Sequence, residues 1–328
     1  MLEYGGYLPL ETSLPDREYY SEKKGYHVIR LNAARYGIAL AAKMCKAERV
    51  WIPIYTCNTV PDTLEQKGIP YCQYNIHTDM EPDIREIGEN DWIVITNFFG
   101  QKGKTFYERM IQKYKRIIFD NTHSFFSEPV PADRVFYVYS PRKFIGVADG
   151  AYLIGQDLEA VDLIQDKSGS RSLFLLKSFE NGTNDCYQEY LDAMDDLTSS
   201  GIRRMSSLTH AILCSADYPE IIARRKKNYA VLVRRFEKIN EYRTDPDDDS
   251  PIAYPLVISN PSIREKLIRN RIYVPQWWKA ILQEPKANEW EKTLSEYLLP
   301  LPMDQRYSEE DMEHMASLIE QCIESTVV

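Results

Sequence analysis

Short apolar runs alternate with helix-like segments from residue 28 to about residue 155. The runs are rich in β-branched and aromatic residues, and we predict six strands from them: Arg49–Pro53, Tyr71–Asn75, Trp92–Phe98, Arg116–Asp120, Val135–Tyr139 and Ala151–Ile154. Between the runs, apolar residues recur at helical spacing and predict three helices: Ala34–Lys46, Thr59–Lys67 and Thr105–Lys115. This alternation is typical of an α/β fold with a largely parallel sheet and crossover helices.

The pattern changes after Gly155. Two acidic segments with helical character reach to about residue 198, and the Ser/Gly/Arg stretch at 168–172 predicts a loop between them. A long basic segment, Ile221–Lys238, predicts a helix that leads into the C-terminal part of the chain.

The C-terminal part predicts one strand near Ala253–Ser259 and a final helix over Glu309–Glu324. The polar stretch Thr244–Pro251 predicts an exposed loop. Because 328 residues exceed what one core usually supports, we expect two domains. The large domain, with an N-terminal arm, would cover residues 1–220, and a smaller α+β domain would cover 221–328.

Composition narrows the possible functions. Hydrophobic residues make up 44% and charged residues 27% of the chain, which is ordinary for a globular protein. The formal charge of -9 argues against nonspecific nucleic-acid binding, which needs a positive surface. No apolar run approaches membrane-spanning length, so we expect no membrane partner. The chain start lacks a basic segment followed by an apolar run, so we expect neither a signal nor a transit peptide.

The cysteines and histidines give no pattern of a metal site. The six cysteines contain no C-x-x-C pair, which is typical of reduced thiols in a cytoplasmic protein. His27, His77, His210 and His314 have no metal-ligand spacing, and we interpret them as structural. We therefore expect no metal.

In open α/β sheets, ligands collect at the carboxyl ends of the strands. One predicted strand ends in Asp120, and His123 follows three residues later. Asp120 is a candidate for a functional carboxylate, but aspartate is also a common cap of a turn. This segment alone leaves both interpretations open.

Another predicted strand ends in Ser140-Pro141-Arg142-Lys143. A Ser-x-x-Lys sequence at a strand end can place a hydroxyl group beside a phosphate and an amine in the same pocket. The alternative is that Arg142 and Lys143 form a solvated pair in a loop.

Small residues, Asn32-Ala33-Ala34-Arg35, lead directly into the first predicted helix. Free backbone N–H groups and the helix dipole at such a start can bind an anion. A helix start with small residues is also common without any ligand, and this stretch contains no glycine before Gly37.

The three segments belong to a series of seven short motifs that follow one another along nearly the whole chain. The motifs are Asn32–Leu40, Val50–Thr56, Gly68–Asp79, Asn97–Gln101, Phe119–His123, Lys143–Ala151 and Tyr297–Tyr307. Together they resemble the DegT/DnrJ/StrS-type aminotransferases. This family uses pyridoxal 5'-phosphate (PLP), has the PLP-dependent transferase fold type I, and acts mostly on nucleotide-linked keto sugars.

The resemblance implies roles for individual residues. Lys143 would hold PLP covalently, Asp120 would pair with the pyridine nitrogen, and His123 would lie beside the 3'-oxygen of the ring. Residues implied to contact the cofactor are Ala33, Ala34, Arg35, Tyr55, Asn97, Asp120, His123, Ser140 and Lys143. Burial and the positive charge of Arg142 are expected to lower the pKa of Lys143, and Asp120 is expected to stay ionised.

The chain departs from the family pattern at the phosphate end of the site. Val138 stands where the family has a serine, so Ser140 is our candidate for that contact. The asparagine that a partner subunit usually contributes is missing, because Arg203-Arg204-Met205 follows Ile202 directly. Cys57 stands where an aromatic residue often stacks on the ring, which leaves Tyr55 as the nearest candidate.

Two further stretches have more than one interpretation. The N-terminal Gly5–Tyr7 could cover the active site or form a free tail. Trp277 and Trp278 could meet the substrate or fill the interface between domains.

The resemblance implies a homodimeric, cytoplasmic aminotransferase that transfers an amino group from an amino-acid donor to a keto substrate. The alternative is a binding or regulatory protein that keeps the fold and has lost transamination. A third reaction, sugar dehydration, is disfavoured because dehydratase relatives replace the lysine with histidine, and Lys143 is retained.

Overall fold

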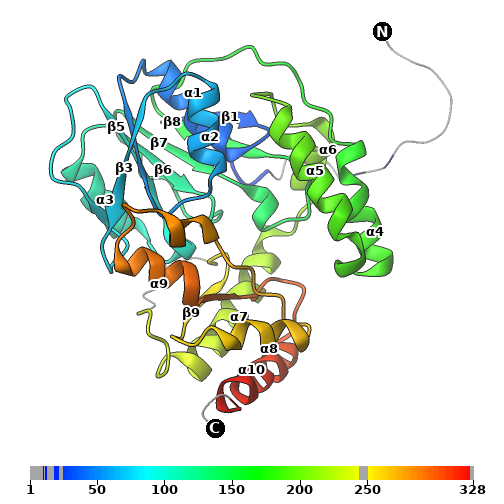
Figure 1. Ribbon diagram of the computed structural model, residues 1–328. Helices are drawn as coiled ribbons and strands as arrows, with labels where there is room; N and C mark the ends of the chain where they lie inside the picture. The colour runs from blue at the N-terminus through cyan, green and yellow to red at the C-terminus, as the bar shows by residue number, and fades with distance from the viewer. Residues whose placement is uncertain (1–9, 11, 13–17, 22–24, 244–249, 326–328) are drawn as a thin grey trace, which may run out of the picture.

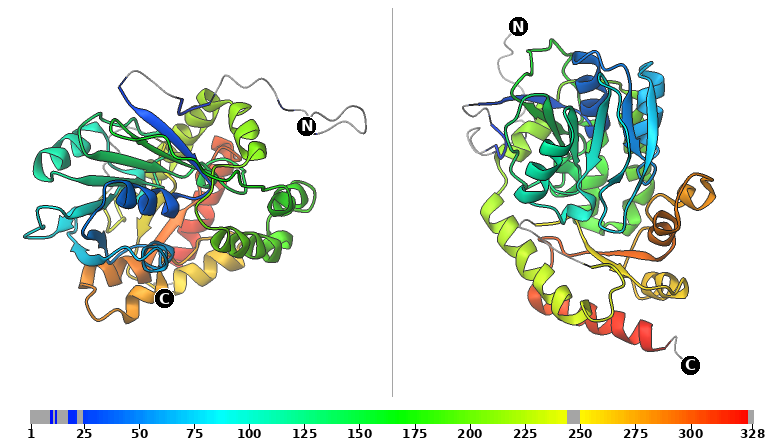
Figure 2. Two further views of the ribbon diagram at one scale, coloured as in Figure 1. Left: turned by 90° about the horizontal axis from the view of Figure 1, so that it is seen from above. Right: turned by 90° about the vertical axis from the view of Figure 1, so that its left-hand side faces the viewer.

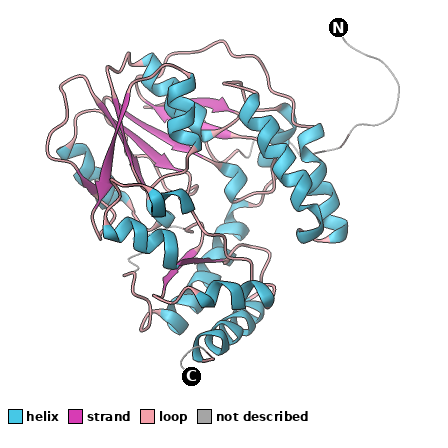
Figure 3. Cartoon of the chain, in the orientation of Figure 1, coloured by secondary structure: helices cyan, strands magenta, loops and turns pink. Residues whose placement is uncertain are grey.

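The computed structural model describes the chain except for residues 1–9, 11, 13–17, 22–24, 244–249 and 326–328. The stretch Gly5–Tyr7 and most of the predicted loop Thr244–Pro251 therefore lie outside the described residues. A large sheet surrounded by helices forms the upper part of the molecule in Figure 1, and the C-terminal part lies below it. Figure 3 shows the strands gathered in the upper part, with a separate small pair below.

Eight strands form the large sheet in the order β1-β8-β7-β6-β5-β2-β3-β4. Strands β7, β6, β5, β2 and β3 run parallel to one another, whereas β8 is antiparallel to both of its neighbours and β4 is antiparallel to β3. The bounds are β1 His27–Leu31, β2 Val50–Pro53, β3 Tyr71–Ile76, β4 Pro82–Asp83, β5 Trp92–Thr96, β6 Ile117–Asn121, β7 Val135–Tyr139 and β8 Ala151–Gly155. The predicted, mostly parallel sheet is confirmed.

All six predicted strands are present, but one ends early. The run Trp92–Phe98 stops at Thr96, because Phe98 begins a 3-10 turn, η1 (Phe98–Gly100), in which Phe99 has a φ of 60°. The edge strand β1 was not among the predicted strands, and neither was the two-residue β4.

Helices cover both faces of the sheet. Along β6 and β7, alternate side chains enter two different apolar cores: Phe119 and Tyr137 pack with α3, and Ile118 and Val138 pack with α1 and α2. This burial on both faces explains why these strands are continuous apolar runs. The helices of this part are α1 Ala34–Met44, α2 Thr59–Gln66, α3 Lys104–Lys113, α4 Leu173–Asn181, α5 Tyr187–Ser199 and α6 Ser207–Cys214.

The chain after β8 differs from the prediction. Residues 156–167 form no helix; they run beside the edge strand, where Gln165 and Leu31 both bridge to Arg204. The predicted loop at 168–172 contains a 3-10 turn, η3 (Ser170–Ser172), that leads directly into α4. Backbone pairing of the acidic segment with Arg204 thus overrides its helical character. The helices α4 and α5 form a hairpin at the right of Figure 1.

The C-terminal part has a core of its own, formed by residues between Tyr229 and Cys322. The predicted final helix has the expected bounds, and the predicted basic helix begins three residues earlier, where the side chain of Asp217 accepts a hydrogen bond from the amide of Glu220. The elements are α7 Tyr218–Phe236, β9 Tyr254–Val257, α8 Ser262–Arg269, η5 Lys279–Gln283, α9 Glu289–Tyr297, β10 Leu298–Leu301 and α10 Glu309–Glu324. In the part of the chain that the structure describes, no helix is long and apolar enough to span a membrane.

Buried polar groups join the C-terminal part to the sheet. Glu291 of α9 is fully buried and accepts hydrogen bonds from the amide of Ile76 and the side chain of Asn75 at the sheet edge. Arg225 of α7 is also fully buried, and its guanidinium group lies 4.7 Å from the ring centroid of Phe144. The right-hand view of Figure 2 shows α7 running from the sheet into the C-terminal part.

Candidate active site

A cavity of about 280 Å³ opens at the carboxyl edge of the large sheet. Its walls come from residues at or just after the ends of β1, β2, β5, β6 and β7, together with helix α5 and the tryptophans that precede η5. This is the edge at which open α/β sheets bind their ligands. The strand ends singled out in the sequence therefore meet in one place.

Asp120 lies near the end of β6 and is 5% exposed. Its Oδ1 accepts a hydrogen bond of 3.1 Å from the amide of Thr122, so the two interpretations of Asp120 are compatible: it caps the turn and also lines the cavity. Burial raises the pKa of this carboxyl group above its ordinary value, although the hydrogen bonds from Thr122 and the charge of Lys143 act in the opposite direction.

His123 is buried one turn further along the same segment. The amide of Phe99 donates a hydrogen bond of 3.3 Å to its Nδ1, which assigns the proton of the neutral ring to Nε2. Burial, assisted by the charge of Lys143, holds the pKa of His123 well below its ordinary value, so the ring is neutral near pH 7. Gly100, with a φ of 75°, permits this approach, because a Cβ atom there would clash with the carbonyl oxygen of His123.

Lys143 follows β7 at the end of the 3-10 turn η2 (Pro141–Lys143). Its side chain is exposed to the space of the cavity, but the cavity itself is surrounded by protein, which desolvates the amine. This burial lowers the pKa of the amine, and Arg142 lowers it further, against the opposing influence of Cys57 and Asp120. A larger fraction of Lys143 is therefore neutral and nucleophilic than for a surface lysine.

The structure explains the serine shift noted in the sequence. Val138 is fully buried in the apolar core, where a Cβ atom on Gly37 of α1 would lie 3.1 Å from its side chain. Ser140, two residues later, lines the cavity and is buried. Of these two residues, Ser140 alone reaches the site.

Seven of the nine residues expected at a cofactor line the cavity: Ala33, Ala34, Arg35, Asp120, His123, Ser140 and Lys143. The other two do not line it. The amide group of Asn97 is used inside the protein, where its Nδ2 donates to Lys102 and Tyr107. Tyr55 is fully buried behind Trp278, with a distance of 4.4 Å between the ring centroids. The sequence around Asn97 and Tyr55 could not show this, because both side chains are kept from the cavity by contacts that form only in the folded protein.

Trp277 and Trp278 line the cavity and also join the two parts of the molecule, so both of their interpretations hold. The centroids of Trp277 and His123 lie 4.9 Å apart with an interplanar angle of 23°, and those of Trp278 and His123 lie 5.9 Å apart with an angle of 7°. Trp278 has a φ of 54°, a left-handed conformation that is uncommon for a bulky residue. This aromatic group forms one wall of the site.

Further lining residues were not singled out in the sequence: Thr59, Thr96, Thr122, Tyr190, Met194 and Thr198. Thr96 would have been found by the strand-end rule if the end of β5 had been placed correctly. The residues of α5 carry no local signal, because they reach the cavity only through packing.

The cavity is electrically polarised along the sheet. Its carboxyl group, Asp120, stands on β6, and Lys143 and Arg142 follow the neighbouring β7. Arg35 lies beyond them at the start of α1. Two polar atoms at the cavity residues, Nε of Arg35 and Oγ1 of Thr96, are buried without a hydrogen-bond partner within the described chain. The site therefore fits a ligand with a basic nitrogen at one end, a group that reacts with an amine, and an anion at the other end.

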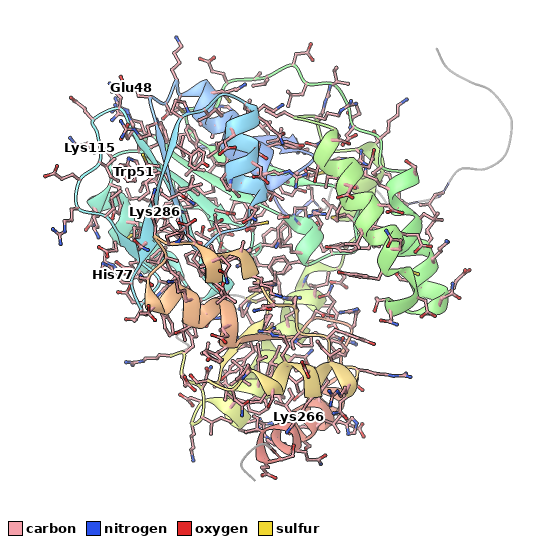
Figure 4. All side chains as sticks on the ribbon, viewed as in Figure 1. Glu48, Trp51, His77, Lys115, Lys266 and Lys286 are labelled. Atoms are coloured by element: carbon pink, nitrogen blue, oxygen red, sulfur yellow. The ribbon has the colours of Figure 1, made fainter. Side chains whose placement is uncertain are left out.

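The remaining histidines lie elsewhere. His77, for example, is exposed at the outer edge of the sheet (Figure 4) and lies 3.6 Å from Asp83. All six cysteines are free. Among the residues that the structure describes, no group of three His, Cys, Asp or Glu side chains could hold a metal ion.

Several solved structures have the same fold. The putative sugar aminotransferase Spr1654 from Streptococcus pneumoniae, in its PLP form, is 15% identical, with a TM-score of 0.66 over 91% of this chain and 87% of that chain. Helicobacter pylori PseC, an aminotransferase involved in the biosynthesis of pseudoaminic acid, is 16% identical, with a TM-score of 0.65 over 91% and 87%. The sugar aminotransferase CalS13 from Micromonospora echinospora is 14% identical, with a TM-score of 0.63 over 90% and 87%.

At these identities the likeness shows the fold. The chain has the fold of the PLP-dependent aminotransferases, which confirms the predicted fold class. No protein-family model and no curated protein sequence matches the chain.

Proposed function

We propose that the protein is a PLP-dependent aminotransferase that moves an amino group from an amino-acid donor to a keto substrate such as a nucleotide-linked keto sugar. One observation carries the proposal: the carboxyl group of Asp120 and the amine of Lys143 line the same cavity at the carboxyl edge of this fold. Similar solved structures, which include a PLP form and a PMP form of a putative sugar aminotransferase, support the choice of cofactor and substrate class.

The residues present fit PLP. The polarity of the cavity corresponds to that of the cofactor, which has a pyridine nitrogen at one end and a phosphate at the other. A protonated ring nitrogen beside Asp120 would supply the positive charge that this buried carboxyl group needs to ionise. The orphaned Nε of Arg35 offers a donor at the opposite end.

When bound, PLP supplies an aldehyde that reacts with amines and a ring that withdraws electrons from the reacting carbon. Lys143 would hold the cofactor covalently and, once released, would move a proton at the reacting carbon, which its lowered pKa favours. Asp120 would keep the ring nitrogen protonated. His123, neutral and protonated on Nε2, can donate a hydrogen bond to an oxygen of the ring. Trp277 and Trp278 exclude water from this side of the cavity.

We also propose that the protein is a homodimer. The hairpin α4–α5 supports this, because α4 buries none of its side chains, and Leu176 and Phe179 are 64% and 94% exposed. Apolar groups that gather on a surface commonly mark an interface. Light scattering would show a dimer for the wild type and a monomer for the double variant Leu176→Glu/Phe179→Glu; an unchanged dimer in the variant would exclude this surface.

The division into a large domain (1–220) and a small domain (221–328) remains a proposal, supported by the separate C-terminal core. We further propose a cytoplasmic location, which the six free cysteines support.

The test of the function begins with absorbance. Purified wild type with added PLP should show a visible band, and borohydride should then fix the cofactor to the peptide that contains Lys143, as detected by mass spectrometry. Lys143→Ala should lose both signals. Lys104→Ala, which removes an exposed lysine on α3, is the matched control and should behave as wild type. Absence of a band in the wild type at saturating PLP would refute the cofactor assignment.

Transamination is tested separately from binding. Addition of amino-acid donors such as glutamate should convert the spectrum of the bound cofactor to that of its amine form, and a keto sugar should restore it. If PLP binds through Lys143 but no donor changes the spectrum, the alternative of a non-transaminating binding or regulatory protein replaces the aminotransferase.

A further inference from the structure

The cavity contains two guanidinium groups that have no carboxylate partner in the part of the chain that the structure describes. Arg35 and Arg142 both line it, and within the described residues neither forms an ion pair. Their charges also act on one another, because Arg35 lowers the pKa of Arg142 in addition to the larger effect of burial. Among carboxylates, Asp149 raises the pKa of Arg142, but its oxygens already accept hydrogen bonds from Ser206 and Thr209. Two like charges placed together without a counter-charge indicate a site for an anion.

Helix α5 fixes the positions of both arginines. Nη2 of Arg35 donates a hydrogen bond of 3.1 Å to Oγ1 of Thr198, and the guanidinium group of Arg142 contacts the sulfur of Met194. Met194 and Thr198 are four residues apart and therefore lie on the same face of the helix. Tyr190, four residues earlier, lines the cavity as well.

The same helix is anchored to the start of α1. Leu197 of α5 is fully buried against Ala33 and Tyr36 of the α1 region, and the hydroxyl of Tyr36 donates a hydrogen bond of 2.7 Å to the carbonyl of Thr198. In Figure 1 this hairpin flanks the sheet on the side of α1 and α6. The two elements that line the cationic end of the cavity, α5 and the start of α1, thus pack on one another within a single chain.

Unused donors are concentrated at this end. Nε of Arg35 is buried without a partner in the described chain. Among the described residues, no side chain caps α1 and its first turn contains no acidic residue, so its first N–H groups also lack a side-chain acceptor there. The helix dipole adds a favourable potential for an anion at the same point.

We propose that Arg35 and Arg142 together bind the phosphate group of the cofactor within one subunit, with α5 holding both side chains in place. The proposal rests on the proposed function. It assigns a role to Arg142, and it supplies phosphate contacts in place of the asparagine that is missing before Arg203. Guanidinium groups suit this ligand, because their paired N–H donors match the oxygens of a phosphate monoester and remain charged at every relevant pH.

The test compares PLP with pyridoxal, which has the same aldehyde and ring but no phosphate. Dissociation constants of both ligands would be measured by absorbance, with borohydride trapping, for the wild type, Arg142→Met and Arg35→Met. The ratio of the two constants is the readout, because a change in the reactivity of Lys143 affects both ligands alike. We expect the wild type to prefer PLP and each variant to lose roughly 10- to 100-fold of that preference.

Three further variants sharpen the comparison. Arg269→Met removes an exposed arginine of α8 and should leave the ratio unchanged, which controls for net charge. Arg142→Lys keeps the charge without the paired donors and should fall between wild type and Arg142→Met. Thr198→Val removes the acceptor of Arg35 and should weaken PLP binding more than pyridoxal binding. Thermal unfolding of each variant without ligand would verify that it is folded.

The outcomes are distinct. An unchanged ratio in both Arg142→Met and Arg35→Met would overturn the inference while covalent PLP binding to Lys143 left the proposed function intact. An unchanged ratio combined with weaker binding of a phosphorylated keto substrate would assign the arginines to the substrate and would also overturn it. If the wild type binds neither PLP nor pyridoxal, the proposed function fails and the inference fails with it.

Discussion

At the scale of single residues, the candidate site is defined by groups whose surroundings disfavour their usual charges. Burial raises the pKa of Asp120 and lowers those of Lys143 and His123. The sequence led us to expect an ionised Asp120, whereas the protein by itself favours the neutral form more than water does. A cationic ligand beside Asp120 is therefore part of what stabilises its charge.

Replacement of Asp120 by asparagine tests this dependence. Asp120→Asn keeps the size of the side chain and its contact with Thr122 but cannot hold a proton on the ring nitrogen. We expect cofactor binding through Lys143 to persist and the rate of the spectral change with an amino donor to fall roughly 100- to 1,000-fold. Stopped-flow absorbance measures this rate, and Asp133→Asn, at an exposed position, is the control. If the rate in Asp120→Asn stays within about twofold of the wild-type rate instead of showing the expected loss, Asp120 has no part in the mechanism.

His123 makes the stability of the unliganded protein depend on pH. Its pKa in the folded protein is well below the unfolded value of 6.5, so the unfolded chain binds more protons at acid pH. The free energy of unfolding should therefore fall as pH falls below about 6.5, by up to about 1.4 kcal/mol per pH unit from this group. Urea unfolding between about pH 5 and 8 should show this slope in wild type and a smaller slope in His123→Phe. Equal slopes in the two proteins would show that His123 titrates normally.

At the scale of elements, α5 has two different surfaces. One surface carries Leu197 and Ala193 into the protein, and the opposite surface leaves Leu191 and Tyr187 exposed to solvent. The inner surface sets the position of the residues that line the cavity. The stability of α5 and the affinity of the site should therefore change together.

Leu197→Ala tests this coupling. Loss of a fully buried leucine should lower the free energy of unfolding by about 2–3 kcal/mol, at the lower end of the usual range because the surrounding cluster is small. It should also weaken PLP binding, because Thr198 and Met194 lose their fixed positions. Leu191→Ala, on the outer surface of the same helix, should change stability by less than about 0.5 kcal/mol. Urea unfolding and PLP titration measure the two effects, and normal PLP affinity in Leu197→Ala would separate α5 from the site.

At the scale of the whole molecule, the C-terminal part is joined to the segment that carries Lys143. Arg225 of α7 packs over the ring of Phe144 and donates to the carbonyls of Pro251 and Ile252. Gln305 donates a hydrogen bond of 2.7 Å to the carbonyl of Phe144 from the C-terminal side. The residue next to Lys143 is thus held by side chains that come much later in the chain.

Arg225→Met should reveal the importance of this junction. It removes the buried donor and leaves two carbonyl groups without their partner, so we expect a loss of about 2–4 kcal/mol in the free energy of unfolding. Arg224→Met, the neighbouring residue whose side chain is half exposed and paired with Glu220, is the control and should cost less than about 1 kcal/mol. Similar losses in the two variants, measured by urea unfolding, would contradict a special role for Arg225.

The sequence by itself determined six of the eight strands of the sheet, all but β1 and β4, and the main residues at their carboxyl ends. Strands buried on both faces must be continuous apolar runs, so β5, β6 and β7 were visible locally, and Asp120, His123, Ser140 and Lys143 could be predicted from their places after those runs. The final helix α10 was predicted with its observed bounds, and in the structure Ser308 and Asp311 form a capping box at its start.

Only the tertiary structure decided what closes the cavity. Trp277, Trp278 and the face of α5 reach it through packing between segments far apart in the chain, and the same packing keeps Tyr55 and Asn97 out of it. Residues 156–167 likewise form no helix, and Gln165 pairs with Arg204, which in turn pairs with Leu31 at the edge of the sheet. Local patterns report the apolar face that an element must bury, but the partner that buries it is chosen by the whole fold, and the walls of the site follow from that choice.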